Sequence, residues 1–356
     1  MTTTTPPEAG EFAGPGSVRA LGRAYLQRVR SLTWTVNRLA ARYPWTAFCS
    51  RRAVRLVVSL YIVITASFAM IRLIPGDPVR AALGVNASPS LIAAKKHQLG
   101  LDQPMIIQYG RYLRDLAHGD FGTSLVTNEP VGTLIREGLP NTLLIAVLAF
   151  VLVLVVAFPI GLLAAIHTRA GRHRRLELVF TGSTSILGSL PGFVLAEGLV
   201  AAFAVELPLF PVAGKSGASS YVLPVVALGL PAAAMLTRIV RIEALRVLGE
   251  DFIRTARSKR LTSRIVYVRH AAPNMVTASL TIAGNLLPSL IAGTVLVENV
   301  FAWPGLGTTI ANSVVNQDYY VVQAVVLILG AIILAVNFLV DALLALLDPR
   351  STIRES

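Results

Sequence analysis

The sequence predicts an all-α integral membrane protein with six transmembrane helices and both termini in the cytoplasm. Charged residues make up only 14% of the 356 residues, whereas soluble globular domains carry about 25%. The mean hydropathy is +0.64, and the apolar residues form uninterrupted blocks long enough to cross a bilayer. The single cysteine, Cys49, excludes a disulfide framework, a thiolate zinc site and a paired-cysteine redox centre.

Six apolar blocks between charged residues supply the predicted spans. A membrane helix needs about 20 mostly apolar residues. We read the blocks as helices because barrel strands would be about half as long and would alternate in polarity. The blocks are Leu56–Ile71 and the stretches between Glu137 and Arg169, Glu177 and Glu197 (extending toward Leu207), Lys215 and Arg238, Arg269 and Glu298, and Asp318 and Asp341.

Basic residues occur in alternate loops, which sets the predicted orientation. Arginines crowd the segment before the first block and the loops 169–175 and 238–269, whereas 298–318 has no Lys or Arg. Loop 75–136, together with Glu137 at its end, balances six basic residues with six acidic ones. Because cytoplasmic loops carry the positive excess, the net charge of +13 is a topology signal, and nucleic acid is not an expected partner.

The predicted spans divide the chain into five regions. An N-terminal extension over 1–54 begins with a disordered Thr/Pro-rich stretch. A basic amphipathic helix follows, with Leu21, Tyr25 and Val29 on one face, and it lies either on membrane lipid or on a protein partner. The remaining regions are the first span at 55–74, an external subdomain at 75–138, a five-helix core at 139–348 with a cytoplasmic loop at 241–271, and a tail at 349–356. Within the external subdomain, Ser88 and Pro89 predict a helix start, and a second helix is expected over Ile106–Leu116.

No constellation of side chains indicates an enzyme. The five histidines form no metal-binding pair, and no G-x-S-x-G nucleophile motif occurs. Gly214-Lys215-Ser216 resembles the end of a phosphate loop, but Leu209 stands where that loop needs a glycine. We therefore predict no catalytic, cofactor-binding or metal-binding residue in this chain.

Three residues within the spans are candidates for a translocation path. Glu197 lies inside the third block, and ionisable groups inside membrane spans are functional candidates by default. Asn285 and Ser289 flank Pro288 in the fifth block, where they line a polar path or hold two helices together. The paired broken helices with midplane charges that are typical of ion-driven secondary transporters are missing.

The cytoplasmic loop 241–271 carries the most informative pattern. Glu243–Leu248 continues the fourth helix, Gly249 ends it, and Asp251 is a candidate N-cap for a short helix with an apolar edge and a cationic edge. Such a helix can seat in a groove of a partner. A loop that is merely positive-inside explains the charge but not the helical regularity. The candidate contact residues are Asp251, Phe252, Ile253, Arg254, Thr255, Ala256, Arg257, Lys259, Arg260, Arg269 and His270.

The run from Phe252 to Lys259, followed by Arg269-His270-Ala271, resembles the cytoplasmic coupling motif of permease subunits of bacterial ABC importers, most closely the dipeptide/oligopeptide/nickel family. The resemblance covers roughly 55–351, and Arg260 stands where the family usually has glycine. The first fifty or so residues have no counterpart in the family. Further matching motifs occur in order: Ile74-Pro75-Gly76-Asp77-Pro78, Leu99-Gly100-Leu101-Asp102, Gly119-Asp120-Phe121-Gly122-Thr123-Ser124, Leu139-Pro140-Asn141-Thr142, the run from Glu298 to Gly307, the run from Asp318 to Gln323, and Leu347-Asp348-Pro349-Arg350.

The resemblance implies a type I ABC importer permease fold in the bacterial cytoplasmic (inner) membrane, and the large first external loop resembles that of the first of two permease subunits. It implies a second permease subunit, two ATPase subunits that carry ATP and Mg, and a substrate-binding protein. That protein would dock on an external face containing Asp77, Asp102 and Trp303. The expected cargo is a dipeptide or short oligopeptide. A metal chelate or haem-like ligand is the alternative, and a stand-alone secondary transporter or channel is the rival from another class.

Overall fold

The computed structural model describes residues 44–73, 79–80, 87–171 and 173–347. The chain divides into two compact units, one comprising 1–55 with 350–356 and the other Leu56–Pro349. Of the first unit, only 44–55 is described, and these residues form the start of a helix. The predicted amphipathic helix and the predicted turn at Ile74–Pro78 lie outside the described residues. The following paragraphs concern the second unit.

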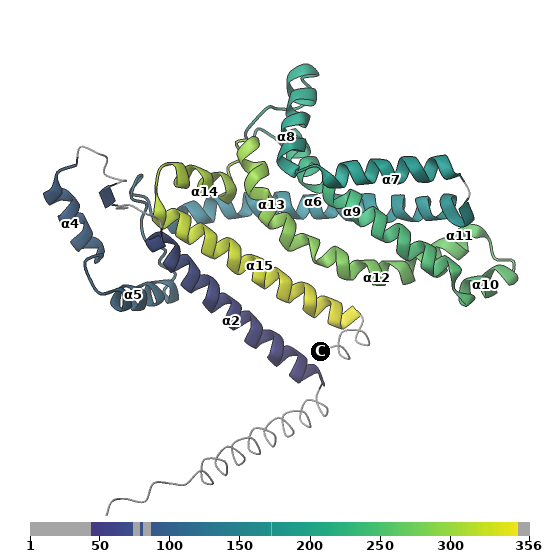
Figure 1. Ribbon diagram of the computed structural model, residues 1–356, viewed down its shortest axis with the longest axis horizontal. Helices are drawn as coiled ribbons and strands as arrows, with labels where there is room; N and C mark the ends of the chain where they lie inside the picture. Colours follow the sequence, from purple (N-terminus) through teal and green to yellow (C-terminus); the bar gives the residue numbers. More distant parts are fainter. Residues whose placement is uncertain (1–43, 74–78, 81–86, 172, 348–356) are drawn as a thin grey trace, which may run out of the picture. The chain divides into compact units, whose positions relative to one another are not determined.

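The described ranges consist of helices and the turns and loops that join them (Figure 1), with one isolated antiparallel bridge between Thr123 and Pro130. The long and medium helices are α2 (Pro44–Leu73), α4 (Pro89–Leu99), α5 (Met105–Ala117), α6 (Val131–Thr168), α7 (Arg174–Ser189), α8 (Gly192–Val200), α9 (Val222–Gly249), α10 (Asp251–Ser258), α12 (Ala272–Gly284), α13 (Leu286–Val300), α14 (Leu306–Val315) and α15 (Tyr319–Leu347). Short elements are η1 (Arg169–Gly171), η2 (Ala201–Glu206), η3 (Ala218–Tyr221), α11 (Ser263–Ile265) and η4 (Val266–Ala271).

Five of the six predicted spans are present as apolar helical stretches long enough to cross a membrane. They are Ser50–Met70, Val131–Thr168, Ala218–Gly249, Ser279–Val300 and Tyr319–Leu346. The prediction of a continuous third span was wrong, because α7 and α8 with η2 are bent by 97° at a short break. Pro191 lacks an N–H and disfavours helical backbone at the residue before it, and Leu190 accordingly adopts an extended conformation with ψ of 125°.

Small residues bring α6 and α9 into close contact at the centre of the fold. The buried face of α6 repeats every three or four residues and is made mainly of alanine and glycine. A Cβ atom on Gly161 would lie 2.6 Å from Val240 Cγ1 of α9, so only glycine fits there. Such close approach supplies dispersion contacts between the helices. These contacts matter in a membrane, because lipid tails provide no hydrophobic driving force for helix association.

The segment before α6 forms two helices, close to where the sequence predicts them. The Ser88 side chain accepts a hydrogen bond from Leu91 N–H and so caps α4, which ends at Gly100 with a φ of 64°. The helix α5 packs on α2, where Phe68 lies 5.0 Å from Tyr109 between ring centroids. The helix α6 begins at Val131, before residue 139, where the five-helix core was predicted to start. Pro140 lies inside this helix and does not end it.

Asp318 fixes the loop between α5 and α6 to the start of α15. Its carboxylate is buried and accepts hydrogen bonds from the Ser124 hydroxyl and from Leu125 N–H, the latter at 3.3 Å. Ser124 Oγ in turn accepts from Val126 and Thr127 N–H groups. One carboxylate therefore orders a turn that lies almost two hundred residues away in the sequence.

Replacing Asp318 by alanine should loosen this turn without unfolding the helices. A hydrogen bond to a charged group contributes about 1.5–3 kcal/mol, and losing that stabilisation locally speeds amide exchange. We expect hydrogen exchange over 122–128 to become at least about tenfold faster, which corresponds to about 1.4 kcal/mol. The control is Glu129→Ala, which removes an exposed carboxylate and should change nothing. Equal exchange in both variants would contradict the role given to Asp318.

Candidate functional site

An exposed stripe of polar and small residues runs along α12 and α13. Thr281, Asn285, Ser289, Ala292 and Asn299 are all exposed and recur at spacings of three, four or seven residues, which places them on one helical face. The exposed Leu296, between the last two, is the apolar member of this face. Polar side chains on a membrane helix are rarely left facing lipid and instead face a bundle interior or a water-filled cavity. The two fifth-span residues predicted for the path, Asn285 and Ser289, therefore share an exposed polar face.

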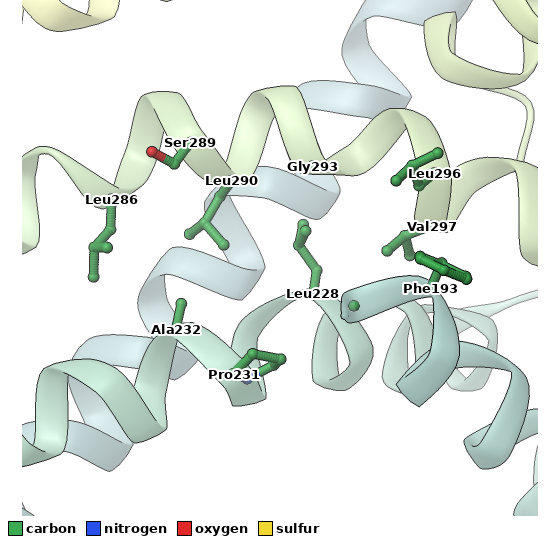
Figure 2. A pocket seen from close by; sticks show the side chains of 11 residues that line it. Phe193, Leu228, Pro231, Ala232, Leu286, Ser289, Leu290, Gly293, Leu296 and Val297 are labelled. Carbon is green, nitrogen blue, oxygen red and sulfur yellow. The ribbon is translucent and has the colours of Figure 1, made fainter. Parts of the chain in front are cut away.

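A recess of about 240 Å³ opens beside this stripe, between α8, α9 and α13. Figure 2 shows Leu286 and Leu290 of α13 directed toward Ala232 and Pro231 of α9, with Phe193 of α8 near Val297. Ser289 carries the only polar side chain of the lining, and it is itself exposed. Asn285 does not line the recess. The site is thus an apolar hollow with one hydroxyl.

The recess follows from the bend in the chain and from small residues. The break at Pro191 turns α8 so that its first residues, Gly192 and Phe193, meet α9 and α13. On α13, Gly293 has no side chain to fill the space, and a Cβ there would lie 3.0 Å from Leu228 Cδ1. Phe193 and Leu228 line the recess, but neither was among the residues that the sequence predicted for the path.

Glu197 is exposed on α8, four residues after Phe193. That spacing places the carboxylate on the same helical face, one turn beyond the recess. Glu197 does not itself line the recess. Its position is near the candidate path but outside its apolar part.

The predicted coupling helix is present as α10, with two corrections. Glu250 occupies the N-cap position without a side-chain hydrogen bond, and Asp251, predicted as the cap, is the first helical residue. Ile253 and Ala256 were predicted to face a partner, but they are buried against the chain's own core. Their spacing of three residues puts both on the side of α10 that packs on α9 and η4. They anchor α10 instead.

The other predicted coupling residues of α10 form an exposed surface. Phe252 is 43% exposed, and Thr255, three residues further along α10, is exposed as well. Arg254 is paired only with Asp251, at 3.3 Å between two exposed side chains. Beyond α10, Arg269 is exposed and His270 half-buried within η4. We call the set Phe252, Arg254, Thr255, Arg257, Lys259 and Arg260 the coupling surface.

Arg260 adopts the left-handed backbone conformation, with a φ of 55°. It follows the end of α10, where Leu261 N–H donates to the Ala256 carbonyl at 3.4 Å and Arg260 N–H donates to the Arg257 carbonyl. This hydrogen-bond pattern closes a helix that ordinarily ends in glycine. The turn of the motif is therefore kept despite the arginine, at the cost of backbone strain.

Replacing Arg260 by glycine should stabilise this turn. A left-handed conformation costs a non-glycine residue about 1–2 kcal/mol, although glycine also gains entropy in the unfolded state. We expect amide exchange over 258–262 to slow by about two- to fivefold. Gly171 also has a left-handed backbone conformation, with a φ of 71°. The opposite substitution, Gly171→Ala, should therefore speed amide exchange around residue 171. Faster amide exchange in Arg260→Gly would contradict the claim that the backbone of Arg260 is strained.

Arg169 adds an unpredicted cation next to the coupling surface. It lies in η1 after α6, and its Nη1 atom is buried without a hydrogen-bond partner among the described residues. Burial lowers the pKa of the Arg169 guanidinium, and the charges of Arg257 and Arg254 lower it further. Figure 1 shows η1, where α6 ends, and α10 at the same end of the bundle. We call this end the coupling end.

The predicted contact residue Trp303 is an internal anchor. Its side chain is fully buried and packs edge-on against Tyr221, with ring centroids 4.7 Å apart. The prediction that Trp303 contributes to an exposed docking face was therefore wrong for its side chain. On either side of it, only Ala302 and Pro304 are exposed.

Hydrogen bonds hold the turn 301–307 on α6 and α13. Glu298 is fully buried and accepts from Gly307 N–H at 2.7 Å, and Thr142 Oγ1 accepts from Leu306 N–H at 2.8 Å. Asn141 donates to the Pro304 carbonyl at 2.6 Å and accepts from Lys215. The turn is consequently a rigid part of the bundle at the end opposite the coupling end.

The remaining predicted external residues lie near α4 or outside the described ranges. Asp102 is partly exposed and bonds His97 Nδ1 at 2.7 Å, a hydrogen bond that lowers the pKa of Asp102. Asp77 lies outside the described residues. Within the part of the chain that the structure describes, no three His, Cys, Asp or Glu side chains are grouped closely enough to hold a metal ion.

The apolar helices, the polar stripe and the basic coupling end define a multi-pass membrane protein of the transport-permease class. The family model described as binding-protein-dependent transport system inner membrane component matches residues 157–353, and the model for the N-terminal part of such components matches 45–146. The chain belongs to this family. It is a permease subunit of an ABC importer and not itself an enzyme.

Curated relatives and one solved structure agree with this assignment. A putative peptide transport system permease protein of Brucella abortus (strain 2308) is 37% identical over 316 residues, covering 86% of this chain and 98% of the relative. The glutathione transport system permease protein GsiC of Salmonella paratyphi A is 35% identical, covering 84% and 96%. The inward-facing MetNI methionine ABC transporter shares the fold, with a TM-score of 0.52, 19% identity and coverage of 60% and 96%.

Proposed function

We propose that this chain forms half of a heterodimeric permease that imports dipeptides or short oligopeptides across the bacterial cytoplasmic membrane. The proposed cargo is inferred from the 37% identity to a peptide transport permease, which extends along 98% of that relative. Glutathione, the substrate in the name of a second relative, is itself a tripeptide. No observation favours a metal chelate or a haem-like cargo.

ATP hydrolysis takes place on two separate ATPase subunits in this proposal, and this chain binds neither ATP nor another cofactor. The coupling surface, together with Arg169, supports contact with these subunits. Arg257, Lys259 and Arg260 have exposed side chains, and the concentration of unneutralised cations suits a partner that presents carboxylates. Charge complementarity of this kind fixes both the partner and its register.

The opposite end of the bundle faces the outside and receives the binding protein. The helices α4 and α5, with Asp102, and the exposed Ala302 and Pro304 of the turn 301–307 supply the docking face. The hydrogen bonds of Glu298 and Asn141 make that turn rigid, and preorganised surfaces lose less entropy on binding. Both termini are then cytoplasmic, as the positive-inside rule predicts.

Uptake into proteoliposomes tests the cargo and the energy source. The complete complex, with its second permease subunit, ATPases and binding protein, is tested. It should accumulate labelled dipeptide only when ATP is supplied on the side of the membrane that carries the ATPase subunits. Peptide flux without ATP would identify a stand-alone transporter or channel. Uptake of haem or a metal chelate with no uptake of any peptide would replace the proposed cargo.

Reporter fusions test the orientation independently. A reporter inserted after Gly171 or Arg257 should be cytoplasmic, and one within 85–130 should be external. Fusions with the reverse activities would overturn the orientation and with it the assignment of the two docking ends.

A further inference from the structure

The recess between α8, α9 and α13 has a size and chemistry that suit part of a ligand. Complete small-molecule sites usually measure about 300–1,000 Å³, whereas this recess measures about 240 Å³. Its walls are formed by side chains such as Phe193, Leu228 and Leu290, without any charged group. One apolar side chain is an occupant of the right size and polarity.

The Ser289 hydroxyl beside the recess indicates that the occupant also has a hydrogen-bond donor. Ser289 Oγ donates its hydrogen to the Asn285 carbonyl at 3.3 Å, so its lone pairs are available to accept a hydrogen bond. The exposed neighbours of Ser289 along the stripe are the polar Asn285 and the small Ala292. A lipid tail offers no donor to such a face. A peptide offers both an apolar side chain and a backbone N–H.

We propose that this recess transiently holds an apolar side chain of the peptide in transit, while Ser289 Oγ accepts a hydrogen bond from the backbone of the same peptide. The inference rests on the proposed function, because it requires a peptide cargo. It assigns to the permease a size-dependent contribution to transport that is separate from selection by the binding protein. A second occupant to be tested is a side chain of the other permease subunit.

Filling the recess should slow bulky apolar peptides selectively. In Ala232→Phe, uptake of dileucine relative to diglycine should fall at least about tenfold, since misfit in an apolar pocket changes selectivity by about 10- to 200-fold. Both rates are measured with the binding protein saturated, so that its own preference does not enter. The matched control is Ala66→Phe, at an exposed position of α2 outside both the stripe and the lining, which should leave the ratio unchanged.

Two further variants keep the proposal testable if Ala232→Phe does not assemble. Phe193→Ala enlarges the recess and should raise uptake of a tryptophan-containing dipeptide relative to dileucine. Ser289→Ala should slow dileucine and diglycine alike, by about two- to tenfold, as expected for one hydrogen bond.

The outcomes separate this inference from the proposed function. The side-chain site is overturned if the dileucine-to-diglycine ratio is unchanged in Ala232→Phe and the ratio of tryptophan-containing dipeptide to dileucine is unchanged in Phe193→Ala, while peptide import itself stands. Loss of the permease heterodimer in Ala232→Phe, with unchanged selectivity in Phe193→Ala, assigns the recess to the other subunit instead. Absence of any peptide uptake by the wild-type complex refutes the proposed function, and the inference with it.

Discussion

Replacing Arg257 by glutamate should abolish peptide-stimulated ATP hydrolysis and import while leaving the subunit folded. Arg257 is exposed on the coupling surface, and a buried charge pair at a protein interface typically costs 2–5 kcal/mol or more when one partner is lost. That loss corresponds to about a 30-fold or greater weakening of ATPase docking. Within the subunit the change is favourable, because it replaces a cation that repels Arg169 by an anion that attracts it.

The matched control for this variant is Arg175→Glu. Arg175 is an exposed arginine at the start of α7, so the substitution changes the net charge equally without touching the coupling surface. Import, ATPase stimulation and thermal stability are measured for both variants at equal expression. Wild-type coupling in Arg257→Glu would show that the cations of this loop serve topology alone. A lowered melting temperature would instead show that Arg257 is needed for folding.

Replacing Gly307 by alanine should cause a large loss of stability at the end opposite the coupling end. A Cβ at this position would lie 2.5 Å from Val295 Cα and 2.8 Å from Glu298 Oε2. The neighbouring backbone must therefore move, and the buried hydrogen bond from Gly307 N–H to Glu298 is disturbed. Overpacking costs about 1–3 kcal/mol, and an unsatisfied buried group costs about 1–3 kcal/mol more.

We expect the apparent melting temperature of the purified complex to fall by about 5–10 °C, because large domains lose about 2–4 °C per kcal/mol. The control is Gly182→Ala in the interior of α7, where an added Cβ meets nothing within 4 Å. That change should be neutral or stabilising, since alanine favours helix over glycine by about 1 kcal/mol. Equal melting temperatures in the two variants would contradict the close packing of the turn 301–307.

The class of the protein and the position of its coupling helix could be predicted from the sequence. Long apolar blocks and alternate basic loops depend on local composition, which tertiary packing does not alter. The short helix α10 was likewise predictable, because Gly249 and the periodicity after it act over a few residues. Its boundaries shifted by only one residue, from Asp251 as cap to Glu250.

Which side chains of these elements reach the surface was decided by tertiary structure alone. Ile253 and Trp303 have the residue types of exposed contact anchors, yet both are buried. Ile253 lies on the side of α10 that packs on α9 and η4, and Trp303 packs on Tyr221, which is distant in the sequence. The hydrogen bond from Asn141 to the Pro304 carbonyl joins residues 163 positions apart. No local pattern contains such a pairing, because burial is a property of the packed neighbours and not of the residue.

The sequence by itself determined that this chain is a multi-pass helical membrane protein with a cationic loop, because hydrophobicity, charge and short-range periodicity are encoded residue by residue. Its ordered motifs, by their resemblance to a known family, indicated a permease. The bend of 97° in the third span also has a local cause, Pro191, although only the structure gave its angle. The tertiary structure alone decided that a recess forms where α8 meets α9 and α13 and that Arg169 lies beside the coupling surface. Both features depend on the packing of segments far apart along the chain, where small residues set how closely helices approach.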